Sequence, residues 1–114
     1  MREPIRDKAR LEHILEAIER VEEFTNGILR PAFDADKMRI YATAYNIQII
    51  GEASYKLSKE FKHSHEETPW RLIEKMRHII VHDYFAVDLD FVWLVITEDL
   101  APLKEQISNY LKEF

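Results

Sequence analysis

The sequence predicts an all-α protein, an up-and-down bundle of four helices, and three observations lead to this prediction. Apolar residues recur at the three-and-four spacing of a helical face along most of the chain. Only two glycines and four prolines interrupt its 114 residues. Turn dipeptides between alternating apolar residues, the usual signal of a β-hairpin, are nearly absent. We therefore expect one domain over residues 1–114, built from helices and short loops.

The first helix is predicted from about Ile5 to about Asn26. The Asn26-Gly27 pair follows this pattern and is typical of a helix C-cap. Glutamates fill the remaining faces, and we interpret them as a solvated surface; a docking surface for a basic partner is the alternative. The apolar face consists of Leu11, Ile14, Leu15, Ile18, Val21 and Phe24.

The second helix is predicted to begin near Asp34 or Asp36, both good N-caps, and to continue to about Phe61. Gly51 inside it costs about 1 kcal/mol relative to alanine, which the close approach of a neighbouring helix would justify. A core stripe comprises Ile40, Ala44, Ile47, Ile50, Ala53, Leu57 and Phe61. A second, polar-aromatic stripe comprises Tyr41, Tyr45, Gln48, Glu52 and Tyr55. This second stripe fits a half-buried seam against another helix, or else a dimer face or the wall of a cleft.

The third helix is predicted to open at Thr68-Pro69, with threonine as N-cap and proline at the first position, and to end near Val81. Its buried side is expected to contain Trp70, Ile73, Met76, Ile79 and Ile80.

The fourth helix is predicted to be capped by Asp88 or Asp90 and to run to the C-terminus. Pro102 lacks a backbone N–H and clashes with the preceding turn, so it should kink or interrupt the helix.

Composition limits the classes of function. The net charge of −5 argues against a protein that coats nucleic acid by bulk electrostatics. A local basic segment, diluted by glutamates, instead indicates a small phosphate site; it holds Lys56, Lys59, Lys62, Arg71, Lys75 and Arg77. There is no cysteine, and no apolar run is long enough to span a membrane. Because the N-terminal residues are charged and lack the apolar centre of a signal peptide, we expect a soluble cytoplasmic protein.

A metal site is a weak alternative. His63 and His65 are separated by one residue in a polar loop, but no third ligand has convincing spacing. We expect no metal and no cofactor.

The most informative motif is R-x4-H-x-Y, formed by Arg77, His82 and Tyr84. Arginine presents a planar fork of donors that matches phosphate oxygens, and histidine exchanges protons near neutral pH. On a continuous helix Arg77 and His82 would lie about 140° apart. They could act together if the helix ends near Val81, or if a second subunit contributes its own pair. Taken alone, the pattern also fits a surface ion pair at a capped helix end.

With this motif at the end of the third helix, the whole chain resembles the HEPN superfamily, and more closely its HepT-like group. The combination is more specific than the motif alone. The residues that carry it are Ile49-Ile50-Gly51-Glu52-Ala53, Pro69-Trp70-Arg71, Met76-Arg77-His78, Val81-His82-Asp83-Tyr84 and Val92-Trp93.

The resemblance implies a metal-independent endoribonuclease with RNA as substrate, catalysed by Arg77 and His82. It implies a homodimer, possibly a higher oligomer, in which two motifs face one cleft. It also implies the toxin of a toxin–antitoxin pair, whose partner is a minimal nucleotidyltransferase that transfers AMP to Tyr84. Further candidates for contacts that support the site are Asp83, Glu52 and His78.

Two other functions remain open at this point. The chain could be a non-catalytic helical partner that helps a nucleotidyltransferase to recognise its substrate, or a bundle of purely structural role. HEPN domains without catalysis tend to lose the arginine or the histidine, and both are present here. A neighbouring nucleotidyltransferase gene would support either the ribonuclease toxin or the non-catalytic partner, and RNA cleavage by pure protein would separate these two functions.

Overall fold

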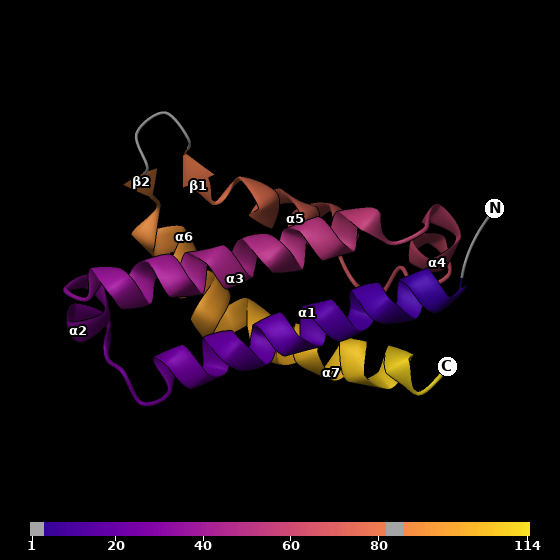
Figure 1. Cartoon of the computed structure of the whole chain (residues 1–114), viewed down its shortest axis with the longest axis horizontal. Coiled ribbons are helices and arrows are strands. Elements are labelled where there is room, and N and C mark those ends of the chain that lie inside the picture. Colours follow the sequence, from indigo (N-terminus) through magenta and orange to yellow (C-terminus); the bar gives the residue numbers. More distant parts are fainter. Residues whose placement is uncertain (1–3, 82–85) are drawn as a thin grey trace.

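A computed structural model describes residues 4–81 and 86–114 (Figure 1). In chain order the elements are α1 (Pro4–Thr25), α2 (Arg30–Asp34), α3 (Lys37–Lys56), α4 (Lys59–His63), α5 (Trp70–Glu74), the 3-10 turn η1 (Lys75–His78), β1 (Ile80–Val81), β2 (Ala86–Val87), α6 (Leu89–Leu94), the π-helical turn η2 (Val95–Asp99) and α7 (Leu100–Leu111).

The helices form four antiparallel rods. The long helices α1 and α3 lie side by side, α5 and η1 run back along α3, and the rod made of α6, η2 and α7 packs against α1 (Figure 1). The predicted all-α, up-and-down bundle is confirmed. None of the described helices combines the length and the apolar character that a membrane span requires.

The core stripe predicted for the second helix is buried along its whole length, from Ile40 to Phe61. It meets apolar side chains from the other rods, including Leu11, Ile14, Ile73 and Ile107. The polar-aromatic stripe behaves differently, since Tyr41, Tyr45 and Tyr55 are 50%, 62% and 52% exposed. About half of each tyrosine is therefore left uncovered by the described chain, which fits a half-buried seam as well as a dimer face or the wall of a cleft.

Local capping sets the ends of α1 and α3. Gly27 has a φ of +72°, the left-handed conformation expected just after a helix. The side chain of Asp36 accepts a hydrogen bond from the Arg39 backbone N–H, so Asp36 is the N-cap of α3. A short helix, α2, precedes it and was not predicted.

The second helix ends earlier than predicted. Leu57 and Ser58 adopt extended backbone, and Ser58 caps a separate helix, α4. The Asp7 carboxylate accepts hydrogen bonds from the Ser58 N–H at 2.9 Å and from its hydroxyl at 2.7 Å. This contact from α1 holds the break in place, and it joins residues far apart in the sequence.

The third helix is also shorter than predicted. Its α-helical part ends at Glu74, and η1 carries the chain to His78. Thr68 does not act as the N-cap, because its hydroxyl bonds instead with Gln106 and Tyr110 of α7.

Two short strands follow η1, a feature that the sequence did not predict. They pair antiparallel, with Ile80 opposite Val87 and Val81 opposite Ala86. Asp88 then caps α6 by accepting a hydrogen bond from the Phe91 N–H. The predicted interruption near Pro102 is present as the π-helical turn η2, which lies just before the proline.

Candidate active site

Arg77 sits where η1 crosses α3 at Gly51. A Cβ atom on Gly51 would lie 2.4 Å from the Arg77 backbone nitrogen and 2.8 Å from the Met76 carbonyl carbon. Both distances are too short for any side chain. The close approach expected for this glycine is confirmed, and the neighbour that requires it is the backbone of the motif arginine.

The Arg77 side chain is held at two further points. Its guanidinium carbon lies 3.7 Å from the centre of the Tyr55 ring, a cation–π stack. Its Nε donates to the Glu74 carbonyl oxygen at 3.1 Å. Within residues 4–81 and 86–114, nothing accepts a hydrogen bond from its two terminal nitrogens. The stack and the hydrogen bond fix the side chain, while its donor fork remains available.

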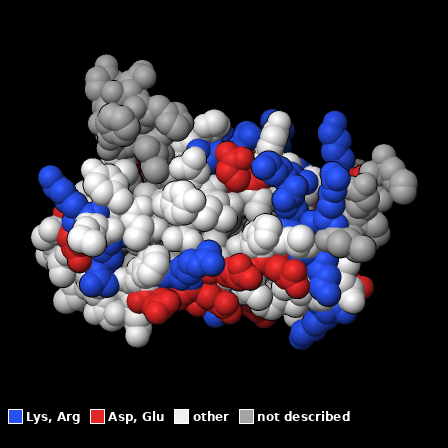
Figure 2. Space-filling view, in the orientation of Figure 1, with Lys and Arg blue, Asp and Glu red and all other residues white. Residues whose placement is uncertain are grey.

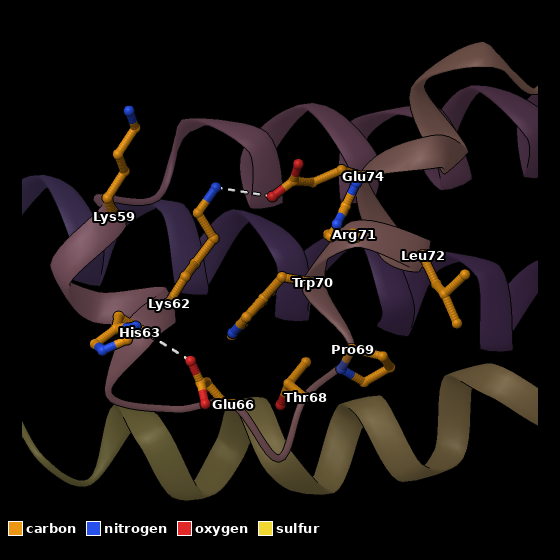
Figure 3. A pocket seen from close by; sticks show the side chains of 10 residues that line it. All are labelled: Lys59, Lys62, His63, Glu66, Thr68, Pro69, Trp70, Arg71, Leu72 and Glu74. Carbon is orange, nitrogen blue, oxygen red and sulfur yellow. Dashed lines mark hydrogen bonds and ion pairs between the residues drawn. The ribbon is translucent and has the colours of Figure 1, made fainter.

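A second cation, Lys62 of α4, lies close by. Its ammonium donates to the Glu74 carboxylate at 2.8 Å (Figure 3). It also donates to the Tyr55 carbonyl oxygen at 3.3 Å. Only 18% of the Lys62 side chain and 20% of the Glu74 side chain are exposed. These two hydrogen bonds of Lys62 link α4 to α5 and to the end of α3, the elements that hold Arg77 in place.

The other predicted site residues differ in their placement. His82, Asp83 and Tyr84 lie outside the described residues. His78 is exposed on η1. Glu52 is exposed on α3 and lines a shallow hollow against α1 with Arg10 and His13. It makes no described contact with Arg77.

The histidines of the polar loop have separate partners. His63 is exposed and pairs with Glu66 at 3.1 Å. His65 stacks on Phe61, and its Nε2 lies 2.8 Å from the Glu113 carboxylate. Among the described residues no group of three or more possible ligands is placed to hold a metal ion.

The pKa of His65 is raised above its usual value. Burial acts to lower it, but the hydrogen bonds to the Phe61 carbonyl oxygen and to Glu113 outweigh this effect. The charged imidazolium is thereby favoured.

Sequence reasoning placed Lys62 in a basic segment and Tyr55 on a possible cleft wall, but it did not connect either of them, or Glu74, with Arg77. Tyr55 lies four positions after Gly51, so helical spacing already places it on the face that meets Arg77. That signal was available. The Lys62–Glu74 pair joins two helices across a loop, and no sequence spacing indicates it.

Comparison with known proteins shows the family to which the chain is similar. The family model described as "Ribonuclease HepT-like" matches residues 14–110. A Thermococcus cleftensis protein described as "Probable ribonuclease HepT" is 41% identical over 102 residues, covering 90% of this chain and 93% of that protein.

Two further relatives are similar. A Methanocaldococcus jannaschii protein described as "Gamma-glutamylcyclotransferase and putative RNase" is 39% identical over 93% of this chain, which spans only 48% of that protein. A Caldanaerobacter subterraneus protein described as "Putative RNase" is 35% identical over 90% of this chain and 92% of its own length. No solved structure matches. With the family model covering most of the chain, the protein belongs to the HepT-like ribonuclease family of the HEPN superfamily.

Proposed function

We propose that this protein is a metal-independent endoribonuclease in which Arg77 binds the scissile phosphate and His82 transfers protons. One observation carries the proposal: the guanidinium of Arg77 is fixed by Tyr55 and Glu74 while its terminal nitrogens have no described acceptor. An arginine held in this way is preorganised for a phosphate, because little rotational freedom is lost on binding.

The reaction needs no metal ion. The 2′-hydroxyl of the RNA attacks the neighbouring phosphorus, a 2′-oxygen–phosphorus bond forms, and the bond to the 5′-oxygen breaks. A histidine takes the proton of the 2′-hydroxyl, and a histidinium gives a proton to the leaving 5′-oxygen. Arg77 stabilises the added negative charge of the phosphorane.

We propose that two chains share this site. A homodimer, possibly a higher oligomer, supplies two arginines and two histidines across a symmetry axis. One histidine then serves as base while the other serves as acid.

The proposal also includes control of the ribonuclease by a partner protein. As a toxin, the protein would be silenced by an antitoxin nucleotidyltransferase that attaches AMP to Tyr84. The hydroxyl oxygen of Tyr84 attacks the α-phosphorus of ATP, pyrophosphate leaves, and the phenolic proton is lost to solvent. The added phosphate would bring negative charge near Arg77 and compete with RNA. Mass spectrometry after incubation with the partner and ATP tests it: an adenylate on another residue, or silencing of Tyr84→Phe, would contradict it.

The central experiment is digestion of RNA by the pure protein in the presence of a chelator. We expect wild type to cut, and His82→Ala and Arg77→Ala to lose on the order of 10²-fold or more in rate. Circular dichroism confirms that each variant is folded. Activity that vanishes with chelator and returns with a divalent ion would contradict the mechanism, as would full activity of folded His82→Ala. A folded wild type that cuts no RNA but binds a nucleotidyltransferase would favour the non-catalytic role instead.

A further inference from the structure

A pocket of about 470 Å³ lies between α4 and α5, beside the support of Arg77 (Figure 3). We call it the α4–α5 pocket. It is lined by Lys59, Lys62, His63, Glu66, Thr68, Pro69, Trp70, Arg71, Leu72 and Glu74.

The charges around this pocket do not cancel. Lys62 is paired with Glu74, and His63 with Glu66 (Figure 3). Lys59 and Arg71 have no ion pair within residues 4–81 and 86–114, and both are exposed. Two cations are therefore available for an anionic ligand, although the whole chain is acidic.

The distribution of charge over the surface agrees with this local excess. Basic side chains gather near the end of the molecule where α3 leads into α4, and acidic side chains line α1 (Figure 2). An RNA strand would be attracted to the first region and repelled from the second.

The wall of the pocket is apolar. Pro69 is exposed and the Leu72 side chain is 62% exposed, so both present apolar surface at the rim. Trp70 lies beneath them and is only 6% exposed, with its indole N–H donated to the His65 carbonyl oxygen. Apolar surface edged by cations suits single-stranded nucleic acid, because the bases pack on the apolar surface and the phosphates bind the cations.

Lys62, which lines the pocket, also lies near the candidate active site. The Lys62 ammonium lies 5.9 Å and the Arg77 guanidinium carbon 3.7 Å from the centre of the same Tyr55 ring, so they are at most 9.6 Å apart. A strand with one phosphate on Arg77 can therefore reach the pocket within a few nucleotides.

We propose that the α4–α5 pocket binds single-stranded RNA next to the bond that is cut. Lys59 and Arg71 contact phosphates, and the surface of Pro69 and Leu72 receives a base. The inference rests on the proposed function, because it takes the substrate to be RNA and Arg77 to hold its scissile phosphate.

The test is RNA binding in a His82→Ala background, where the strand stays intact. The pocket variant is Lys59→Ala/Arg71→Ala. The control, Lys37→Ala/Arg20→Ala, removes one lysine and one arginine from elsewhere, since Lys37 begins α3 at its far end from α4 and Arg20 lies on α1. Fluorescence anisotropy with a labelled RNA of about 12 nucleotides, within known single-strand site sizes, gives Kd at several salt concentrations.

We expect the pocket variant to bind this RNA about tenfold more weakly at low salt, and its log–log salt slope to fall by about 1.4, or about 0.7 for each lost contact. The control variant should bind as its parent does.

Equal affinity and equal salt slope in the two variants would overturn the inference, as would absence of RNA binding by the parent. Loss of binding to an acidic protein partner with unchanged RNA affinity would assign the pocket to a protein instead. The proposed function fails separately: if wild type cuts no RNA while the pocket variant still loses RNA affinity, the pocket stands and the catalytic proposal falls.

Discussion

At the scale of single residues, the position of Arg77 is decided by contacts that its own motif does not contain. Gly51 admits its backbone, the Tyr55 ring supports its guanidinium, and the Glu74 carbonyl accepts from its Nε. A misplacement of about 1 Å can cost on the order of 100-fold in rate. The residues that place Arg77 should therefore matter to catalysis without touching the reacting atoms.

Tyr55→Ala should lower kcat about fivefold, because it removes a cation–π contact worth about 1 kcal/mol. Tyr55→Phe keeps the ring and should retain nearly wild-type kcat. The measurement is steady-state cleavage of a short RNA by both variants, with kcat and KM separated. Equal kcat in Tyr55→Ala and Tyr55→Phe would show that the stack does not position Arg77.

At the scale of elements, the contact between α3 and η1 depends on one missing side chain. Gly51→Ala places a Cβ atom within 2.4 Å of the Arg77 backbone nitrogen, so α3 and η1 must separate. Overpacking typically costs about 1–3 kcal/mol, partly offset by about 1 kcal/mol of helix propensity. We expect a modest loss of stability in urea and a clear loss of cleavage, since η1 carries Arg77.

Gly27→Ala is the matched control for this prediction. Gly27 has a positive φ but nothing within 4 Å of its Cβ position. Alanine there should cost about 1–2 kcal/mol through backbone strain and leave the rate of cleavage by the folded protein unchanged. If both variants lose activity in proportion to stability, Gly51 has no special role in placing Arg77.

A second link between elements depends on pH. Burial lowers the pKa of His65 beside α4, but the hydrogen bond with the Phe61 carbonyl oxygen, the pair with Glu113 beyond the end of α7 and the nearby Glu67 outweigh burial and raise it. A raised folded-state pKa means that the pair stabilises the fold fully below the ordinary value of about 6.5. This contribution is lost as the pH rises through the higher folded-state pKa.

Glu113→Gln should therefore reduce the stability measured at pH 6 and have little effect at pH 9. Because Glu113 is half exposed, we expect the difference to stay below about 1 kcal/mol. Thermal unfolding of wild type and variant at both values measures it. A loss of stability in Glu113→Gln that is equal at pH 6 and pH 9, or larger at pH 9, would show that the pair with His65 does not stabilise the fold in this way.

At the scale of the whole molecule, one face of α3 is left uncovered by the described chain. Met38, Tyr41, Tyr45 and Tyr55 are all at least half exposed. With Gln48 and Glu52 between them, they alternate at spacings of three and four, the pattern of a seam between two helices. This supports the proposed homodimer, with α3 of each chain at the interface.

Tyr45→Glu should convert the dimer to a monomer, because it adds one negative charge from each chain to a seam that already holds Glu52 of each chain. Light scattering at micromolar concentration gives the oligomeric state. Mixing inactive Arg77→Ala and His82→Ala chains should restore part of the cleavage if the site is shared. A wild type that is monomeric and active would rule out the composite site.

Much of the fold could be predicted because it follows from periodicity. The stripe from Ile40 to Phe61 was found from spacing alone and is buried. The breaks between helices were harder to predict from the sequence. The end of α3, for example, depends on the Asp7 carboxylate binding Ser58, which is 51 residues away in sequence. Thr68 was predicted to be a helix N-cap from its local pattern, but its hydroxyl bonds with Gln106 and Tyr110 of α7 instead.

The sequence by itself determined the four amphipathic rods and the R-x4-H-x-Y motif, and it narrowed two N-caps to Asp34 or Asp36 and to Asp88 or Asp90, because each of these features depends on residues within one or two turns of each other. The tertiary structure decided how Arg77 is held, where the bundle leaves unpaired cations, and which face of α3 stays open. The first two features arise around the end of α3, where α4, α5 and η1 meet it, and the third arises where no described element covers α3. Spacing along one helix carries no information about which backbone atoms of another element will lie against it.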